Sequence, residues 1–558
     1  MTIKQLSFRT FCLCAAAILL ISLAFGVYWG MQKQALFIDE TFSYMLSNSQ
    51  TDYGLHANIT PDTWTDASAF STALCVTPGE EFDYHRVYLN QEHDVHPPLY
   101  YDVLHTVSSF FPGQFSIWFG IGINMFFYAA GFVVLAAILL LITQNNRALA
   151  LAILLIYATN CSTMSLLLFI RMYMMFTFFT LLVTWLHLLV LRGKLRFPIF
   201  LMLTAISCFL GFLTQYFFLI YMAFLCLLYS IHLLVRKPYG AKSIRYFVMY
   251  AASLLIALGA TYVAFPPWVD HLFSGQRGIG SFSAFSGEAI FSFVNEKAYY
   301  GILNDTLFAG TLTYLLLAIV LLVIVTFFVH RKQCPGNAKS QAASPVSSFG
   351  LWLTTGTVVL FLWIAARAGL PGVGASHVIF RFIVPGYALL LSLVMLAMYK
   401  LSAGLLKRSA WALVCTLVLF GFINVLGYRQ SYRIDSRIAQ GEPLFAYSFE
   451  QEHLDFAQAH KDTPVVVLFR NRIGYHRIIT EMMQYRQLYF THVDYYNIDD
   501  ASVAAAEDCE ELIVYIPYGD EDEGSYLGFI LETFPWLYGE EWQYDTLNND
   551  YSVYLFSI

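Results

Sequence analysis

Charged residues are scarce in this sequence. Asp, Glu, Lys and Arg together make up 12% of the 558 residues, whereas hydrophobic residues make up 58%. In a soluble globular domain the charged fraction is about a quarter and the apolar fraction about half. The composition therefore excludes a single ordinary soluble domain and predicts a polytopic membrane protein.

A concentration of positive charge is also missing. The net charge is −7, the acidic residues gather in the last quarter of the chain, and the Lys and Arg residues lie in short gaps between apolar runs. Proteins that bind nucleic acids present a basic patch or stripe. No such field is present, so a nucleic-acid partner is not expected.

The nine cysteines do not form the closely spaced pairs that bind zinc or act in thiol redox chemistry. Most of them lie inside apolar runs, where they serve as small apolar side chains. Cys75 and Cys509 fall in segments expected outside the membrane. A disulfide between these two is conceivable, but no sequence feature requires it.

Long apolar runs are abundant. The first, Phe8 to Gly30, follows Lys4 and Arg9, and no small-residue cleavage site precedes Asp39. We therefore expect a retained first helix with a cytoplasmic N-terminus. Ten further runs of membrane-spanning length bring the expected number of spans to about eleven. They are Phe115 to Ile142, Ala148 to Phe169, Met172 to Val190, Phe197 to Leu213, Tyr216 to Val235, Tyr246 to Phe265, Leu307 to Val329, Phe349 to Ala366, Val378 to Tyr399 and Ala410 to Gly427.

The positive charges support this arrangement, because Lys and Arg favour cytoplasmic loops. They recur in alternate gaps: at Arg147; at Arg192, Lys194 and Arg196; at Arg236, Lys237, Lys242 and Arg245; at Arg331, Lys332 and Lys339; and at Lys400, Lys407 and Arg408. The other gaps are then expected to face outward. These are Met31 to Gln114, the turns at Arg171 and Gln215, the loop Pro266 to Thr306, the turn Arg367 to His377, and everything after Tyr428.

The last part of the chain changes character. Residues 428–558 are predicted to form a small extracytoplasmic α/β domain, and residues 1–427 a membrane domain with the extracytoplasmic loop 31–114. Short apolar runs typical of buried strands and two helical patterns support the C-terminal domain. The strands are expected at Pro464 to Phe469, Glu510 to Ile516 and Tyr551 to Phe556, and the helices near Arg472 to Arg486 and Gly524 to Phe534.

The adjacent acids Asp39 and Glu40 open the first outward segment. A carboxylate at a lipid-shielded rim is suited to accept a proton from a hydroxyl nucleophile, because partial desolvation raises its basicity. Alternatively, Asp39 could cap a short helix that begins at Thr41. The sequence of this segment leaves both interpretations open.

Two arginines, Arg171 and Arg381, are expected at a similar depth on the outer side. Such an arginine can reach toward lipid headgroups, or it can bind a phosphate with its planar guanidinium. Two of them on the face opposite the positive side indicate an anionic, lipid-borne ligand. Gln215 and Tyr216 form a third outer polar and aromatic pair, although an interfacial aromatic belt also explains the tyrosine.

Together these residues resemble the GT-C superfamily of polytopic glycosyltransferases, and within it the protein O-mannosyltransferases and aminoarabinose transferases. The similarity covers most of the membrane region up to about residue 400, and it depends on four motifs in a fixed order. They are Asp39-Glu40, the Asp94-x-His96-Pro-Pro-Leu-Tyr100-Tyr101 segment, Arg171-x-Tyr173, and Arg381-Phe-x-x-Pro385. Many relatives carry an acid two positions before the arginine of Arg-x-Tyr, whereas Phe169 stands here, which places a second carboxylate and a tight metal site in question.

The resemblance implies a GT-C-like fold and the transfer of a hexose or pentose from a polyprenyl-phosphate carrier to an acceptor on the outer face, with inversion. It implies that Asp39 is the general base, that Glu40 and His96 support the site, and that Arg171 and Arg381 hold the lipid phosphate. Further substrate-binding candidates at the same rim are Asp94, Tyr100, Tyr173, Gln215 and Tyr216. No cofactor is required, although a divalent cation bound by Asp94 or Glu40 could share the charge stabilisation.

A polytopic transporter of an anionic or lipid-linked substrate is the main alternative. A transporter would place ionisable groups near the middle of the bilayer, whereas here they gather at one rim. A sensor or structural membrane protein comes third, because it leaves the two outer arginines unexplained.

Overall fold

The computed structural model describes residues 6–33, 36–49, 59–274, 293–333, 345–369, 376–406, 408–434, 451–471, 474–519, 522–546 and 550–558. The chain divides into two compact units. One, which we call the helical unit, comprises Met1–Val27, Val95–Tyr100 and Gly122–Tyr432. The other, the mixed unit, comprises Tyr28–Asp94, Tyr101–Ile121 and Arg433–Ile558.

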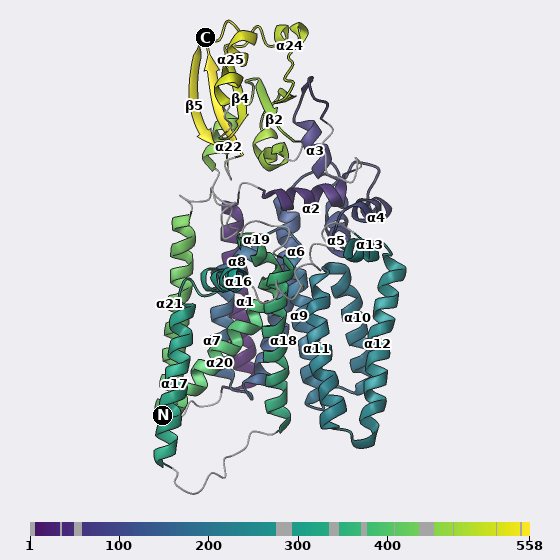
Figure 1. Ribbon diagram of the computed structural model, residues 1–558, viewed down its shortest axis with the longest axis vertical. Helices are drawn as coiled ribbons and strands as arrows, with labels where there is room; N and C mark the ends of the chain where they lie inside the picture. The colour runs from purple at the N-terminus through teal and green to yellow at the C-terminus, as the bar shows by residue number, and fades with distance from the viewer. Residues whose placement is uncertain are drawn as a thin grey trace. The chain divides into compact units, whose positions relative to one another are not determined.

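Nine of the eleven expected spans each contain one long apolar helix. Within the described residues, nine helical stretches are long and apolar enough to cross a membrane, and a tenth span is formed if one bent pair is counted. The helices are α1 (Phe8–Gln32), α6 (Ile117–Ile142), α9 (Tyr173–Leu191), α10 (Phe197–Thr214), α11 (Phe217–Ile231), α12 (Ser243–Ala264), α18 (Pro345–Gly369), α20 (Tyr387–Leu406) and α21 (Ser409–Ile434) (Figure 1). The bent pair is α7 (Arg147–Ala158) with α8 (Cys161–Leu168), and α17 (Leu312–Gln333) is a shorter apolar helix over Leu312–Phe328. A polytopic membrane protein is confirmed.

One expected span is wrong in detail. The run Ala148 to Phe169 does not form one helix, because α7 and α8 meet at an angle of 54°. The Asn160 side chain caps α8 by accepting the Ser162 N–H at 3.0 Å. From α21, Asn424 Nδ2 donates to the Ile156 carbonyl at 2.9 Å and to Thr159 Oγ1 at 3.0 Å. Side chains therefore satisfy the interrupted backbone in place of water.

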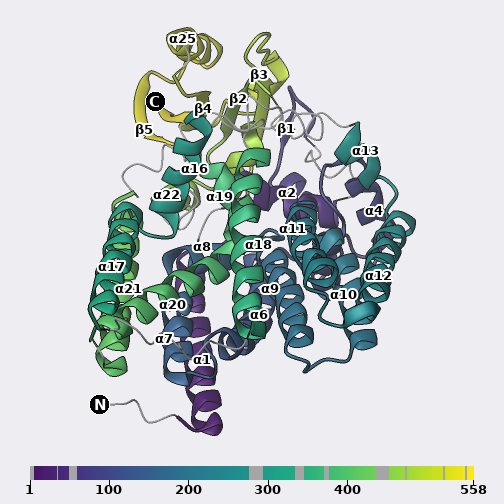
Figure 2. The ribbon, with the colours of Figure 1, turned by 60° about the horizontal axis from the view of Figure 1, so that its bottom comes forward.

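Four of the long helices, α9, α10, α11 and α12, run side by side in the helical unit (Figure 1 and Figure 2). Polar side chains join them inside this group. His187 of α9 lies within hydrogen-bond distance of the Tyr250 hydroxyl, 2.8 Å away, and its other ring nitrogen lies 2.7 Å from the Val183 carbonyl. Tyr250 is also 3.2 Å from Cys226 Sγ. These contacts link α9 to α12 and α12 to α11, and buried polar residues commonly hold membrane helices together in this way.

Short helices occupy segments between the spans. The first outward segment holds α2 (Ile38–Asn48), α3 (Ser68–Leu74), α4 (Tyr84–His93) and α5 (Leu99–Ser109). Later segments hold α13 (Trp268–Phe273), α16 (Phe293–Thr306) and α19 (Ser376–Ile383), with a 3₁₀ turn at Val384–Gly386. Residues 31–114 are therefore largely helical, which their composition did not indicate.

The mixed unit contains a six-stranded sheet in the order β1-β3-β2-β4-β6-β5. β2 is parallel to β3 and β4, whereas the other neighbours are antiparallel. The strands are β1 (Trp64–Thr65), β2 (Val465–Phe469), β3 (Leu488–His492), β4 (Glu511–Pro517), β5 (Gly539–Asp545) and β6 (Tyr551–Ser557), and the helices are α22 (Gln451–Ala459), α23 (Ile479–Met482), α24 (Asp500–Ala504) and α25 (Glu523–Thr533). The small C-terminal α/β fold is confirmed, with three more strands than the sequence predicted.

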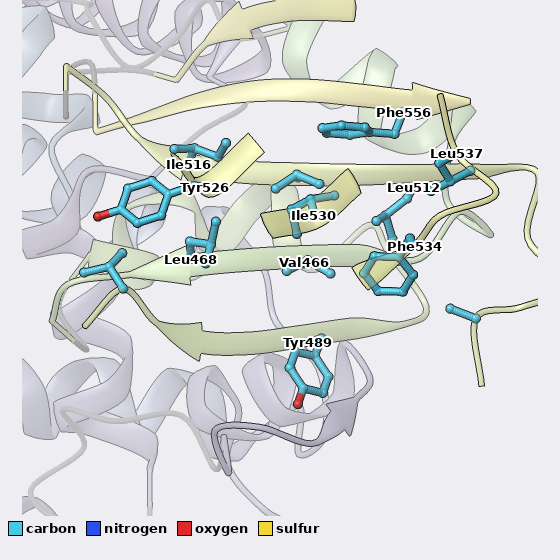
Figure 3. Close-up of a cluster of buried hydrophobic side chains, with 13 residues drawn as sticks. Val466, Leu468, Tyr489, Leu512, Ile516, Tyr526, Ile530, Phe534, Leu537 and Phe556 are labelled. Carbon is cyan, nitrogen blue, oxygen red and sulfur yellow. The ribbon is translucent and has the colours of Figure 1, made fainter. Parts of the chain in front are cut away.

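Alternate residues of the strands face opposite sides of the sheet. Figure 3 shows Val466, Leu468 and Ile516 gathered with Ile530 of α25 and with Phe534, which directly follows α25, in one hydrophobic core. The intervening residues, such as Tyr515, face the other side. The two faces of the sheet therefore carry different sets of side chains.

The segment between α1 and α6 and the C-terminal region share this sheet. β1 pairs with β3, so that Trp64 lies opposite Tyr489. Trp64 Nε1 donates to the Ser502 carbonyl at 3.0 Å, and Thr491 Oγ1 donates to Asp62 Oδ1 at 2.7 Å. Two regions that are far apart in sequence thus fold as one unit.

The boundary expected at residues 427 and 428 stays a prediction. Cys75 and Cys509 are both free thiols.

A buried carboxyl lies on the second side of the sheet. Glu481 Oε2 accepts hydrogen bonds from the hydroxyls of Tyr515 at 2.8 Å and Tyr544 at 2.9 Å. His453 Nδ1 is 3.9 Å from its other oxygen, and the Tyr485 hydroxyl is 3.1 Å from that of Tyr515. Burial raises the pKa of Glu481 to about 7, although the two tyrosine hydrogen bonds oppose the shift.

We expect this carboxyl to make the mixed unit less stable as pH rises. A raised pKa means that the folded state favours the protonated form, so stability is full below the unfolded pKa and is lost as pH rises toward about 7. The loss should be on the order of 2–3 kcal/mol. Hydrogen exchange at the β4 amides of the full chain, measured from pH 5 to 8, should reveal it, and Glu481→Gln should remove it. Glu511→Gln, a change at a partly exposed acid, serves as the control. An unchanged pH dependence in Glu481→Gln would refute this assignment.

Candidate functional site

Arg171 lies in the four-residue connection between α8 and α9. Its side chain is buried, with an exposed fraction of 2%, and its backbone N–H donates to the Phe169 carbonyl at 2.7 Å. Asn124 Nδ2 donates to the same carbonyl at 2.6 Å. The broken span therefore ends in a tight, hydrogen-bonded turn that holds a guanidinium inside the helical unit.

His96 contacts this arginine. Arg171 Nη2 is 3.3 Å from His96 Nε2. A guanidinium has only donors, so His96 Nε2 must be the acceptor and the imidazole must be neutral in this contact. The histidine therefore orients the guanidinium without offsetting its positive charge. The sequence placed these two residues in separate motifs, and the structure brings them together.

Aromatic rings connect Arg381 to the Arg171 turn. The Arg381 guanidinium lies over the Phe382 ring, 5.0 Å from its centroid. Phe382 contacts the Tyr173 ring edge-on at 6.2 Å and stacks on Phe217 at 4.4 Å. The starts of α9 and α11 and the short helix α19 therefore share one aromatic cluster. The cluster joins three of the expected outer-rim segments.

Phe169, which departs from the family pattern, also belongs to this group. Its ring is stacked on Tyr173, with centroids 5.9 Å apart and an angle of 3° between the planes. An apolar ring thus occupies the position at which the resemblance implies an acid. Tyr173 is buried between Phe169 and the edge of Phe382, so its proposed substrate-binding function depends on its hydroxyl end.

Gln215 and Tyr216 are buried in the turn between α10 and α11. The Tyr216 hydroxyl is 2.9 Å from His271 Nδ1. Trp268, one turn earlier on α13, contacts Phe212 edge-on at 5.3 Å. The first turn of the loop Pro266 to Thr306 therefore packs onto the α10–α11 turn. Residues 275–292 of this loop, long enough on sequence grounds for a lid, lie outside the described residues.

In the mixed unit, the acid pair opens α2. Asp39 is half-buried in the first helical turn, whereas Glu40 is fully buried. Glu40 Oε2 accepts the Phe37 backbone N–H at 2.8 Å and the Lys33 ammonium at 2.9 Å. The capping function considered for Asp39 therefore falls on Glu40. Of the two acids, Glu40 is fixed by a structural ion pair, and Asp39 is the better candidate for chemistry.

The remaining candidates lie in two places. Asp94 is half-buried at the C-terminal end of α4, in the same unit as Asp39. Tyr100 is buried at the start of α5 and belongs to the helical unit. Within the described residues, no group of three or more His, Cys, Asp and Glu side chains could hold a metal ion.

Sequence reasoning missed several residues of these sites. Lys33 follows the first span seven residues before Glu40, but nothing in that spacing distinguishes an ion pair from a headgroup anchor. His271 is one of several polar residues in a long loop. Asp102 directly follows the Tyr100-Tyr101 pair, and burial raises the pKa of its carboxyl to about 7. A carboxyl with such a pKa is suited to acid–base chemistry near neutral pH.

No family model and no curated protein matches this chain. Among solved structures, ArnT from Cupriavidus metallidurans bound to undecaprenyl phosphate is similar over 98% of this chain and 97% of its own, with 9% identity and a TM-score of 0.45. The archaeal oligosaccharyltransferase AglB from Archaeoglobus fulgidus, in complex with an inhibitory peptide and a dolichol-phosphate, is similar over 94% of this chain and 72% of its own, with 11% identity and a TM-score of 0.40. A likeness of this degree carries neither a substrate nor a residue function over to this chain.

We expect the Lys33–Glu40 pair to be essential for α2. The exposed fractions of the two side chains are 3% and 0%, so Lys33→Met should leave a buried carboxylate without its ammonium and cost about 3–5 kcal/mol. Hydrogen exchange at the α2 amides of the full chain measures this loss. The double variant Lys33→Met with Glu40→Gln, which removes both charges and keeps the cap, should recover most of it.

Lys461→Met, at an exposed lysine of the same unit, provides the control, and we expect it to change the opening free energy by less than about 0.5 kcal/mol. If Lys33→Met has an effect as small as Lys461→Met, the ion pair does not stabilise α2.

Proposed function

We propose that this protein is a membrane glycosyltransferase that moves a sugar from a polyprenyl-phosphate carrier to an acceptor on the outer face of the membrane. One observation carries the proposal. A buried arginine, Arg171, is oriented by a neutral histidine and shares an aromatic cluster with the segment of a second arginine, Arg381. These two arginines belong to motifs that resemble those of GT-C enzymes.

The chemistry of the leaving group explains why such arginines are needed. When the bond between the sugar and the lipid phosphate breaks, negative charge develops on the phosphate. Preorganised positive groups in a site without bulk water stabilise that charge most effectively, by on the order of a few kcal/mol for one donor. Guanidinium groups fit phosphate oxygens because their N–H groups form a planar fork. Arg171 and Arg381 are proposed to bind the phosphate before and after transfer.

Asp39 is proposed to be the general base. Its carboxylate would take the proton from an acceptor hydroxyl while that oxygen attacks the anomeric carbon. The bond between this carbon and the phosphate oxygen breaks, and the electron pair leaves with the phosphate, so the anomeric configuration is inverted. Glu40 supports the base by fixing the first turn of α2 through Phe37 and Lys33.

A divalent cation could lower the charge on the phosphate. Glu40 fits a metal site poorly, because one of its oxygens already receives a backbone N–H and an ammonium. Asp94, which is half-buried, is the better candidate ligand.

The Lys and Arg residues in alternate gaps support the proposal of a cytoplasmic N-terminus and a C-terminal region on the outer side. The acceptor is a lipid, a glycan or a protein with a free hydroxyl or amine, and the C-terminal region is proposed to contribute to its selection.

We expect Asp39→Asn to abolish most of the transfer. Losing a general base typically lowers the rate by about 10²–10⁴-fold, so kcat should fall by that factor while the affinity for the donor changes little. The assay is sugar release from a panel of polyprenyl-phosphate sugars by the purified chain. Asp66→Asn, at an exposed acid of the same unit, is the control. Transfer at the wild-type rate in Asp39→Asn would exclude this residue as the base.

Arg381→Ala should weaken donor binding by about tenfold or more, because it removes a charge-assisted interaction with the phosphate. Titration with a polyprenyl phosphate measures the change, and acceptor affinity should be less affected. Arg245→Ala, at an exposed arginine in a gap expected on the cytoplasmic side, provides the comparison. Equal donor affinity in the two variants would refute a phosphate-binding function for Arg381.

A further inference from the structure

We propose that Asn124 is the positioning residue for Arg171, because its side-chain amide holds the turn from which Arg171 extends. The inference rests on the proposed function in one respect, since it takes Arg171 as a ligand of the carrier phosphate. Asn124 lies near the middle of an apolar run, and none of the four family motifs includes it.

The contacts of Asn124 are specific. The residue belongs to α6 and is fully buried, with an exposed fraction of 0%. Its Nδ2 donates to the Leu167 carbonyl at 3.2 Å and to the Phe169 carbonyl at 2.6 Å. An amide nitrogen carries two hydrogens. Both donors are therefore used at one place, the C-terminal end of α8.

These carbonyls need a donor from outside their own helix. The last four carbonyls of an α-helix have no partner within it, and inside a membrane there is no water to replace the missing N–H groups. α8 ends at Leu168 because the chain turns at Phe169 toward α9. Asn124 therefore caps α8 from a neighbouring helix.

The cap also fixes Arg171. The Phe169 carbonyl accepts both the Asn124 amide and the backbone N–H of Arg171. One oxygen thus joins α6 to the residue that carries the guanidinium. Only four residues separate the end of α8 from Tyr173 at the start of α9, so the turn can adopt few other conformations without moving a helix. Without Asn124, the Leu167 and Phe169 carbonyls would each lose one donor, and the Arg171 N–H would hold the Phe169 carbonyl without the link to α6.

A purely structural function is the alternative, and the chain offers a matched control for it. Asn424 of α21 is also buried, and its Nδ2 also donates to a backbone carbonyl of the interrupted span, at Ile156, and to the Thr159 hydroxyl. It acts at the break itself, at the C-terminus of α7, whereas Asn124 acts at the C-terminus of α8. Removing either asparagine takes a donor from the interrupted span, but only Asn124 contacts the turn that carries Arg171.

The first experiment measures binding of undecaprenyl phosphate to the full chain in detergent. We expect Asn124→Leu to weaken binding about tenfold, since displacement of a positioned group by a fraction of an ångström is costly, and Asn424→Leu to weaken it less than about twofold. In the Arg171→Ala background, Asn124→Leu should cause no further loss. Equal effects of the two asparagine variants, or an additional loss in the Arg171→Ala background, would overturn the inference.

The second experiment does not depend on the ligand. Hydrogen exchange at the Arg171 amide should accelerate about tenfold in Asn124→Leu and stay unchanged in Asn424→Leu. If the wild-type protein binds no undecaprenyl phosphate, the proposed function of Arg171 fails and this exchange measurement alone decides for Asn124. Unchanged exchange at Arg171 overturns the inference. Should Asn124→Leu not fold, Asn124→Asp keeps the shape and removes both N–H donors.

Discussion

The structure depends on a constraint of the membrane: a backbone group that loses its helical partner cannot turn to water. The span that contains α7 and α8 is interrupted, and its free carbonyls are satisfied from other helices. Asn424 serves the end of α7, and Asn124 serves the end of α8. α8 ends at Leu168, and the short turn that follows it holds Arg171. A continuous helix through Phe169 would carry this side chain along the helix surface instead.

Buried charged side chains have different contacts in the two units. In the mixed unit, the Lys33 ammonium meets the Glu40 carboxylate at 2.9 Å, so the pair is neutral overall and serves to fix α2. In the helical unit, the Arg171 guanidinium contacts a neutral imidazole, and this contact leaves its positive charge unchanged. A buried guanidinium is suited to an anionic ligand, because the low dielectric strengthens their attraction. The difference explains why Glu40 is proposed as a support and Arg171 as a ligand of the phosphate.

Much of the fold could be predicted from the sequence, because membrane spans and fully buried strands leave continuous apolar runs. The spans, and the strands β2, β4 and β6, were visible for this reason. The break at Asn160 was not, because a single polar residue barely changes the average over a run of twenty. β3 was not predicted, and it follows the segment Arg472 to Arg486, whose pattern predicted a helix. β1 has only two residues, and its partner strand lies more than four hundred positions away. The site residues in motifs were found by resemblance, whereas Lys33 and Asn124 depend on contacts that only the fold defines.

The shared sheet also restricts the membrane topology. Because β1 pairs with β3, the first outward segment and the C-terminal region must lie on the same side of the membrane. The number of spans between them must therefore be even. Among the described residues, eight of the nine long apolar stretches follow α1, and the bent pair α7–α8 and the shorter helix α17 are the two uncertain cases. Counting only one of them would give nine and place the two halves of the sheet on opposite sides. Both cross the membrane, or neither does.

If α7 and α8 returned to the side they came from, the positive gaps at Arg147 and at Arg192 to Arg196 would lie on opposite sides, against the preference of Lys and Arg for one face. The positive charges therefore favour an arrangement in which both cross, and the described residues would then hold eleven spans, the number that the apolar runs predict.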